Sequence, residues 1–166
     1  MTTLTLSHVI ISLVAIAAGL VAFYGMTVNR PYPRWTAVFL VTTILTSLSG
    51  FLFPITKVTP GIVFGVLSLI ALSLATVALY AKHLRGGWRA TYIVTAIFSL
   101  YLNVVVLIVQ SFQKIPVLHA LAPTQSEPVF LAVQLITLVA FLGFGYRAMV
   151  HFAQEAAPTR LNDHAA

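Results

Sequence analysis

The 166-residue chain contains no cysteine and almost no acidic residues. The absence of cysteine excludes disulfide bonds, thiolate metal sites and a cysteine nucleophile. Asp and Glu number three against nine Lys and Arg, and charged residues make up 7% of the chain, whereas soluble domains average about 25%. With 60% hydrophobic residues and a mean hydropathy of +1.00, the composition excludes a soluble globular domain and a disordered chain. It indicates a membrane protein.

Five apolar stretches are long enough to cross a bilayer core as helices, which takes about 20 residues each. They cover residues 6–26, 36–53, 62–81, 91–112 and 129–150, and Arg147 is the one Lys, Arg, Asp or Glu inside them. The first is expected to be a retained helix, because the residues before it lack the Lys or Arg of a signal peptide. The sequence predicts an all-α integral membrane bundle of five transmembrane helices over residues 1–153 and a cytoplasmic tail over 154–166.

The basic residues predict the orientation of this bundle. Seven of them fall on one side of the five spans, namely Arg30, Arg34, Lys82, Arg85, Arg89, Arg147 and Arg160. Lys57 and Lys114 fall on the other side. Because Lys and Arg favour cytoplasmic loops, we expect the N-terminus outside and the C-terminus in the cytoplasm. The basic residues stand singly between apolar runs, so nucleic-acid binding is not expected.

Polar residues inside the spans are the best indication of a site, because burying them in lipid is costly. At 100° per residue, one face of the fourth span and its extension carries Tyr92, Thr95, Ser99, Asn103, Gln110 and Lys114. Gln134 in the last span is expected at the depth of Gln110, and the two could face each other. We expect a ligand cavity in the outer half, with Ser99, Asn103, Gln110 and Gln134 in its wall. A loop from Lys114 to Glu127 that includes His119 would cover it. The alternative is that these polar side chains only form hydrogen bonds with neighbouring helices and line no cavity.

Small and hydroxylated residues mark further faces. Ser12, Ala15 and Gly19 in the first span, and Gly61, Gly65 and Ser68 in the third, predict close helix packing. Five hydroxyl residues between positions 42 and 49 favour packing over the alternative, a small-molecule site. Thr124-x-x-Glu127 predicts a capping box at the start of the last span, and the alternative role of Glu127 is a counter-charge for Lys114.

The histidines leave two cofactor hypotheses open. His8 and His119 are expected on the outer side and His83 and His151 on the inner side, and such pairs could hold a haem. A metal ion could bind His8, His119 and Glu127, although no H-E-x-x-H motif is present. The sequence also lacks a nucleophile elbow, paired carboxylates and a phosphate-binding loop. It therefore assigns no catalytic residue and does not favour an enzyme.

The segment from Tyr101-Leu102-Asn103-Val104 through residues 119–128 (HALAPTQSEP) resembles a hallmark of small bacterial inner-membrane proteins. The resemblance implies a bacterial plasma membrane, implies no particular reaction and supplies no catalytic residues. From the residues we expect a protein that binds or moves a small, mostly apolar molecule through the outer cavity. Two alternatives stay open: a haem- or quinone-handling redox subunit, and a structural or accessory subunit that docks a partner or a second copy.

Overall fold

The computed structural model describes residues 3–53 and 60–152, and in this part of the chain it contains helices but no strand. The elements follow in the order α1 (Thr3–Thr27), α2 (Pro33–Gly50), α3 (Pro60–Thr76), the π-helical turn η1 (Val77–Ala81), α4 (Trp88–Lys114), α5 (Pro116–Leu121) and α6 (Pro128–His151). The tail expected over 154–166 lies outside the described residues.

Proline begins most of these helices. Pro33, Pro60, Pro116 and Pro128 are the first residues of α2, α3, α5 and α6. The first turn of a helix has no internal acceptor for its N–H groups, so a residue without an N–H and with a fixed φ fits there. At the C-terminal end of α1, Asn29 takes a φ of 53°, a left-handed conformation that is frequent just after a helix.

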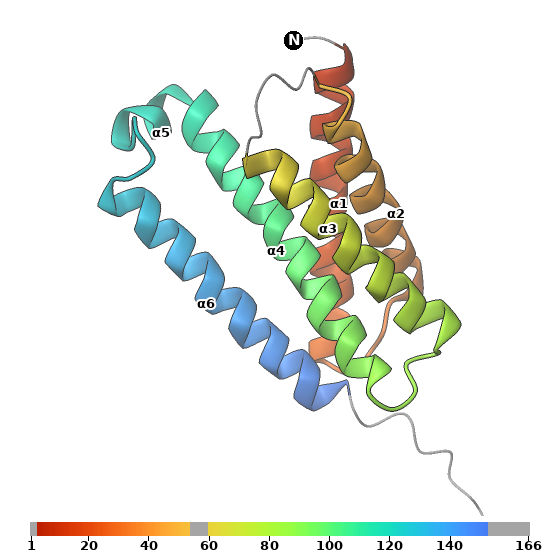
Figure 1. Ribbon diagram of the computed structural model, residues 1–166. Coiled ribbons are helices and arrows are strands. Elements are labelled where there is room, and N and C mark those ends of the chain that lie inside the picture. The colour runs from red at the N-terminus through yellow and green to blue at the C-terminus, as the bar shows by residue number, and fades with distance from the viewer. Residues whose placement is uncertain (1–2, 54–59, 153–166) are drawn as a thin grey trace, which may run out of the picture.

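The helices run alternately up and down (Figure 1). α1 packs most extensively against α2, and α3 against α4, while α2 also contacts α3 and α1 also contacts α4. These four helices enclose the centre of the bundle. The described chain therefore starts at one end of the bundle and, five long helices later, finishes at the other.

α6 lies at the edge of the bundle, against α4 and α1. Near its C-terminal end the Arg89 guanidinium of α4 donates to the Met149 carbonyl oxygen at 3.2 Å. Near its N-terminal end the rings of Phe112 and Phe130 meet edge to face, with their centroids 5.3 Å apart. Between these two contacts the rings of Tyr101 and Phe141 meet with their centroids 5.5 Å apart, while much of the remaining surface of α6 is exposed and apolar.

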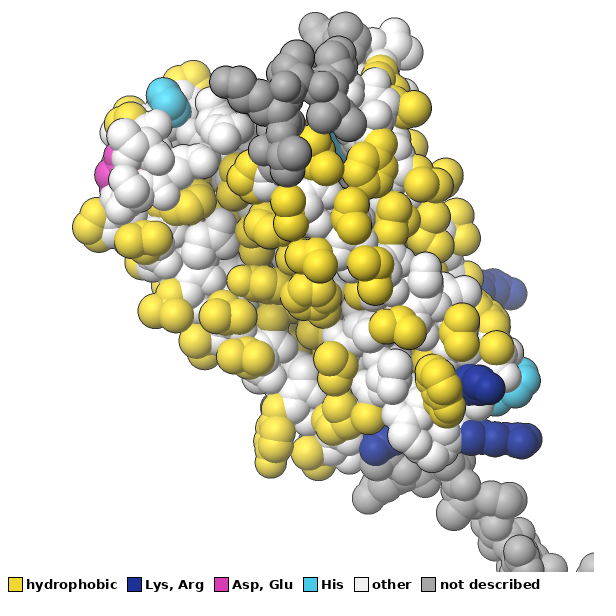
Figure 2. All heavy atoms as spheres, viewed as in Figure 1, with side chains coloured by type: hydrophobic (Ala, Val, Ile, Leu, Met, Phe, Trp, Pro, Cys, Tyr) yellow, Lys and Arg dark blue, Asp and Glu magenta, His cyan; other side chains and the backbone are white. Residues whose placement is uncertain are grey.

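Four helical segments are long and apolar enough to cross a membrane: Thr3–Thr27, Pro60–Ala81, Trp88–Lys114 and Pro128–His151. Large hydrophobic side chains cover the outside of the bundle, as lipid contact requires (Figure 2). The described part of the chain is thus all-helical and has the character of a membrane protein. α2 is not among the four, since Arg34 and its many hydroxyl residues make it less apolar. The five-span prediction is therefore not confirmed, and a crossing by α2 stays a prediction.

Positive charge collects at one end of the bundle, which we call the basic end (Figure 2). The described residues that carry it are Arg30, Arg34, Lys82, Arg85, Arg89 and Arg147. Lys114, at the end of α4, lies at the opposite end. The asymmetry expected from the sequence is therefore also a property of the folded bundle.

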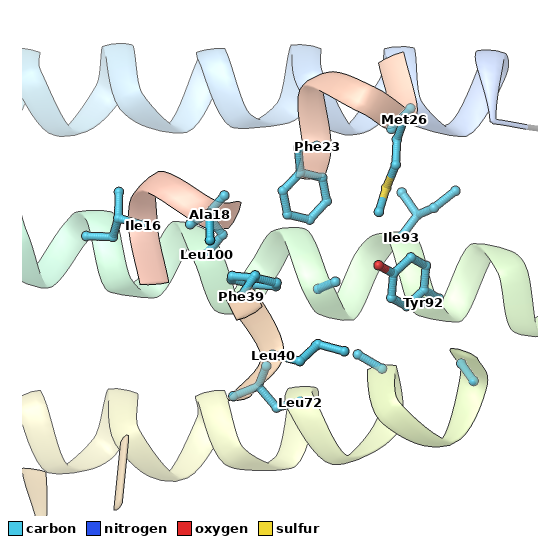
Figure 3. Close-up of a cluster of buried hydrophobic side chains, with 14 residues drawn as sticks. Ile16, Ala18, Phe23, Met26, Phe39, Leu40, Leu72, Tyr92, Ile93 and Leu100 are labelled. Carbon is cyan, nitrogen blue, oxygen red and sulfur yellow. The ribbon is translucent and has the colours of Figure 1, made fainter. Parts of the chain in front are cut away.

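The buried core fills the half of the bundle nearer the basic end (Figure 3). Phe39 of α2 and Leu100 of α4 are each 1% exposed and approach α1 at Gly19. A Cβ built on Gly19 would lie 2.7 Å from Leu100 Cδ1 and 2.8 Å from Phe39 Cδ2. The small-residue face predicted on the first span thus lets three helices approach closely. Tyr92, expected on the polar face of α4, is also buried here, near Thr36.

Two short elements differ from the sequence prediction. Residues 116–121, expected as loop, form α5, and residues 77–81, expected to continue an α-helix, form the π-helical turn η1. The Lys82 N–H donates to the Val77 carbonyl oxygen, five residues back, at 2.9 Å. A wider turn of this kind depends on which carbonyl oxygen accepts each N–H, which hydrophobic periodicity does not reveal.

Candidate functional site

A cavity of about 530 Å³ lies between α1, α2, α3 and α4, at the end of the bundle opposite the basic end. Its apolar wall consists of Val9, Leu13, Ile16, Phe51, Phe53, Ile62, Phe64, Leu102, Val106, Leu107 and Ile115. Its polar wall consists of Thr5, His8, Ser12, Thr46, Ser47, Ser68, Asn103, Gln110, Ser111 and Lys114. The volume falls within the range of about 300–1,000 Å³ that is usual for small-molecule sites.

Three polar groups at the deep end of the cavity have no hydrogen-bond partner within the described chain. They are the Ser68 hydroxyl, the Thr46 hydroxyl and the Nδ2 group of Asn103. Ser68 is 2% exposed and Thr46 is 7% exposed. Burying a hydroxyl or amide group without a partner costs about 1–3 kcal/mol. The deep end of the cavity is therefore suited to a molecule that offers polar atoms to these groups.

Glycines on α3 create part of the space. Gly61 and Gly65 both line the cavity, and a Cβ on Gly65 would lie 3.3 Å from Cζ of Phe51. The sequence predicted that the face with Gly61, Gly65 and Ser68 packs closely against another helix. Gly65 does approach Phe51 closely, and the same face also lines the cavity wall.

His8 is held by α2. Its Nδ1 lies 2.8 Å from the Ser49 hydroxyl oxygen, and its ring meets the Phe53 ring edge to face at 5.4 Å between centroids. The Ser49 hydroxyl donates its own hydrogen to the Thr46 carbonyl oxygen at 3.0 Å. With the Ser49 hydrogen on the Thr46 oxygen, Ser49 accepts from Nδ1–H and Nε2 of the neutral ring is an acceptor; with that hydrogen on Nδ1, Nε2 carries the proton and is a donor.

Gln110 and Lys114 stand at the rim of the cavity, both exposed, on the same face of α4 as Asn103. Ser111 beside them donates its hydroxyl to the Leu107 carbonyl oxygen at 2.8 Å. Lys114 lies near enough to His8 for the charges of the two groups to interact. Neither Asp nor Glu occurs among the described residues of the wall. The rim is thus positive, with no carboxylate in its described part to neutralise it.

The structure brings together three of the residues expected at a ligand site, namely Asn103, Gln110 and Lys114. Ser99 is fully buried below the cavity, and its hydroxyl donates to the Thr95 carbonyl oxygen at 2.9 Å. Gln134 is on α6, and no described residue of α6 lines the cavity. The expectation that Gln134 shares a cavity with Gln110 is wrong, because α6 packs on another side of α4. Whether the three rim and wall residues bind a ligand stays a prediction.

His119 and Glu127 also lie away from the cavity wall. His119 is exposed on α5, and Glu127 directly precedes α6. The described segment after Lys114 is held at α4 and α6 rather than over the four-helix centre: the Gln125 amide donates to the Val109 carbonyl oxygen at 2.9 Å. The loop therefore does not contribute its described polar residues to the wall.

Glu127 organises the turn before α6. One carboxylate oxygen accepts the Thr124 N–H at 3.0 Å and the Thr124 hydroxyl at 2.9 Å, and the other accepts the Ser126 N–H at 3.0 Å. The hydrogen bond from the Thr124 N–H, followed by the other donors, holds the pKa of Glu127 below its usual range. The predicted capping box is wrong in register, since Glu127 itself occupies the N-cap position and α6 begins one residue later. Its carboxylate is used locally, so it does not pair with Lys114.

The histidines do not form the metal site that one of the cofactor hypotheses requires. In the described chain, no three His, Asp or Glu side chains lie close enough to hold a metal ion, so His8, His119 and Glu127 do not form a metal site. His8 is bonded to Ser49, whereas His83, His119 and His151 are exposed at separate places in the chain. The haem hypothesis stays a prediction.

Sequence reasoning missed several residues of the wall. His8 was considered only as a cofactor ligand, and Ser12 and Ser68 only as packing residues. Thr46 and Ser47 belong to the hydroxyl-rich stretch of α2, for which packing was favoured. That stretch was the available indication, because hydroxyls turned away from lipid must face either a helix or a cavity.

Comparison with known proteins adds no relative to this description. No protein-family model, no curated protein and no solved structure matches the chain. The function therefore has to be argued from the site itself.

Proposed function

We propose that this protein binds a small, mostly apolar molecule in the cavity between α1, α2, α3 and α4. The observation that carries the proposal is the set of unpartnered polar groups of Ser68, Thr46 and Asn103 at the deep end of an otherwise largely apolar wall. Small-molecule sites typically combine such a wall with a few convergent polar groups. A purely structural cavity would gain stability from apolar residues at these three positions.

The shape of the bundle favours binding over free passage. Below Asn103 the space between the helices is filled by core side chains, among them Ile16, Leu72 and Leu100. A molecule in the cavity therefore meets a packed floor. Movement of a molecule to the basic end would require the four helices to separate there, so these contacts favour binding over transport.

We further infer that all five long helices, α2 included, cross a bacterial inner membrane, with the N-terminus outside and the C-terminus in the cytoplasm. The alternating helix directions and the collection of basic residues at one end support this topology. α2 packs along α1 more extensively than any other pair of helices does, which supports its crossing beside α1. In this topology the cavity lies in the outer half of the membrane.

A pair of matched substitutions on α4 tests the binding proposal. Val106 lines the cavity, whereas Val94 is 57% exposed on the outer surface of the same helix. In Val106→Trp the indole would occupy the cavity, while in Val94→Trp it would point to lipid. The protein in nanodiscs is titrated with the neutral fluorescent probe 1-aminoanthracene, and the signal of empty nanodiscs is subtracted.

We expect wild type and Val94→Trp to bind the probe with similar affinity and Val106→Trp to bind it at least about tenfold more weakly, a loss of about 1.4 kcal/mol. Circular dichroism and a monodisperse elution profile check that all three are folded. Equal binding by the two variants, or no binding above empty nanodiscs by the wild type, would refute the proposal.

A further inference from the structure

We infer that the occupant is an elongated amphiphile with a neutral hydrogen-bonding group at its inner end and an anionic group, such as a carboxylate, at its outer end. This inference rests on the proposed function, because it specifies which apolar molecule the cavity takes. It follows from the different chemistry of the two ends of the cavity and from the distance between them.

The inner end offers neutral groups only. Ser68 and Thr46 contribute hydroxyls, and Asn103 contributes an amide group, all without a partner in the described chain. A carbonyl or hydroxyl oxygen can satisfy such groups without bringing charge into the bundle. An ionised group would be costly at this depth, because no described residue of opposite charge lines that part of the wall.

The outer end is positive. Lys114 stands at the rim, and no described carboxylate lines the cavity. Glu127, the one acid among the described residues, is occupied by Thr124 and Ser126. Lys114 also lies at the C-terminal end of α4, where a cation is favourable in itself. Stabilising the helix end does not require Lys114 to lie on the cavity side of the helix, in line with Gln110 and Asn103, so this position points to a second role.

The separation of the two ends sets the length of the molecule. Asn103 and Lys114 are eleven residues apart on one helix, which at about 1.5 Å per residue corresponds to about 16 Å along the axis. Between them, α4 lines the cavity with the apolar Val106 and Leu107 and, nearer Lys114, with Gln110 and Ser111. An extended dodecyl chain is of similar length and fits such a wall.

Three probes of equal chain length test the neutral inner group and the anionic outer group separately. Dodecanoate has only the outer anion, the α,ω-dodecanediol has only neutral polar ends, and ω-hydroxydodecanoate has both. Each is titrated calorimetrically into the protein in nanodiscs at low salt, at a pH where the acid is ionised, and the partitioning into empty nanodiscs is subtracted. We expect ω-hydroxydodecanoate to bind tightest.

Two substitutions remove one requirement each. Lys114→Gln should abolish the preference for ω-hydroxydodecanoate over the diol, a change of about three- to fivefold for a partly solvated ion pair, and Lys114→Arg should retain it. Ser68→Ala should abolish the preference for ω-hydroxydodecanoate over dodecanoate, by about fivefold for one hydrogen bond. Arg147→Gln, which removes an exposed cation at the basic end, should change neither preference.

The outcomes separate this inference from the proposed function. Binding of the neutral fluorescent probe and of the diol, with no preference for the hydroxy acid or with a preference that survives Lys114→Gln, would overturn the inference and leave the binding proposal standing. Equal weakening of all three probes by Lys114→Gln would overturn it as well. Failure of every probe, the neutral ones included, would refute the proposed function itself.

Discussion

Ser68 and Ser99 have the same side chain and almost the same burial, yet their surroundings differ. Ser99 on α4 is fully buried and donates to the Thr95 carbonyl oxygen one turn back at 2.9 Å. Ser68 on α3 is 2% exposed and has no partner in the described chain. The bond of Ser99 is local and satisfies its hydroxyl within its own helix. The hydroxyl of Ser68 is left for whatever occupies the cavity.

This difference predicts that alanine stabilises the protein at position 68 and not at position 99. Ser68→Ala removes a buried polar group without a partner and should raise the free energy of unfolding of the ligand-free protein by up to about 1 kcal/mol. Ser99→Ala removes a group that is already satisfied and should lower it slightly or leave it unchanged. The measurement is reversible unfolding in mixed micelles, followed by circular dichroism. A loss of stability in Ser68→Ala would show that its hydroxyl has a structural partner.

For single residues, the sequence predicted correctly which side chains of α4 share a face, but it misplaced Gln134 of α6. The angle of 100° per residue correctly aligned Asn103, Gln110 and Lys114, because positions on one helix are fixed by helix geometry alone. Gln134 was misplaced because its position depends on how α6 is rotated and on which side of α4 it packs. α6 is apolar around most of its circumference, so its sequence leaves that rotation open.

Among the elements, the turn between α5 and α6 is the one whose structure depends most on a charge. Glu127 accepts three hydrogen bonds there, from the Thr124 N–H, the Thr124 hydroxyl and the Ser126 N–H. These bonds lower its pKa in the folded protein. The stabilisation is therefore complete above the pKa of the unfolded chain and is lost as the pH falls through the lower, folded pKa.

Hydrogen exchange tests this dependence at single amides. We expect the Thr124 and Ser126 amides to lose protection in Glu127→Gln at neutral pH, because the neutral amide oxygen is a weaker acceptor. Wild type acidified below the folded pKa should show the same loss, after correction for intrinsic exchange. The Leu131 N–H is the internal control, since it donates to the backbone oxygen of Glu127 at 3.1 Å. Unchanged protection of Thr124 and Ser126 in both cases would contradict the assigned role.

The long elements were predictable and the short ones were not. Each of the five apolar stretches corresponds to a long helix, with boundaries that differ by a few residues. The length of each apolar run supplied that information. α5 has only six residues, too few to produce a hydrophobic period, and Pro116 was interpreted as a loop residue. The polar residues on α4 predicted a cavity beside that helix. The contribution of α1 and α3 to its wall was not predicted, because small residues are found both where helices pack closely and where they line a cavity.

For the whole molecule, the central question is whether α2 crosses the membrane. Four segments have the length and hydropathy for crossing, and α2, with Arg34 and its hydroxyls, is less apolar. Several of those hydroxyls are shielded from lipid, since Thr43, Thr46 and Ser47 are buried. Thr42 is satisfied within its own helix, where its hydroxyl donates to the Val38 carbonyl oxygen at 2.6 Å. A helix whose polar groups face its neighbours can cross lipid at a lower hydropathy than an isolated one.

The absence of native cysteine makes this question testable by single-cysteine labelling. Four exposed positions sample both ends of the bundle: Pro31 before α2, Leu52 after it, Gly87 before α4 and Ala120 on α5. A side chain at Gly87 meets nothing within 4 Å, so cysteine fits there. We expect a membrane-impermeant maleimide to label Leu52→Cys and Ala120→Cys in intact bacterial cells that express the protein. Pro31→Cys and Gly87→Cys should react only after permeabilisation, and the cysteine-free wild type should not react at all.

The pair that flanks α2 decides the number of crossings. If Pro31→Cys and Leu52→Cys react under the same conditions, α2 lies along one surface and the bundle crosses four times, so the cavity would no longer be closed on all sides by spanning helices. If the two differ but Leu52→Cys is the protected one, all five helices cross with the basic end outside, contrary to the effect of Lys and Arg on topology. Only labelling of Leu52→Cys and Ala120→Cys together places the cavity in the outer half, where Lys114 would meet an anionic amphiphile arriving from that side.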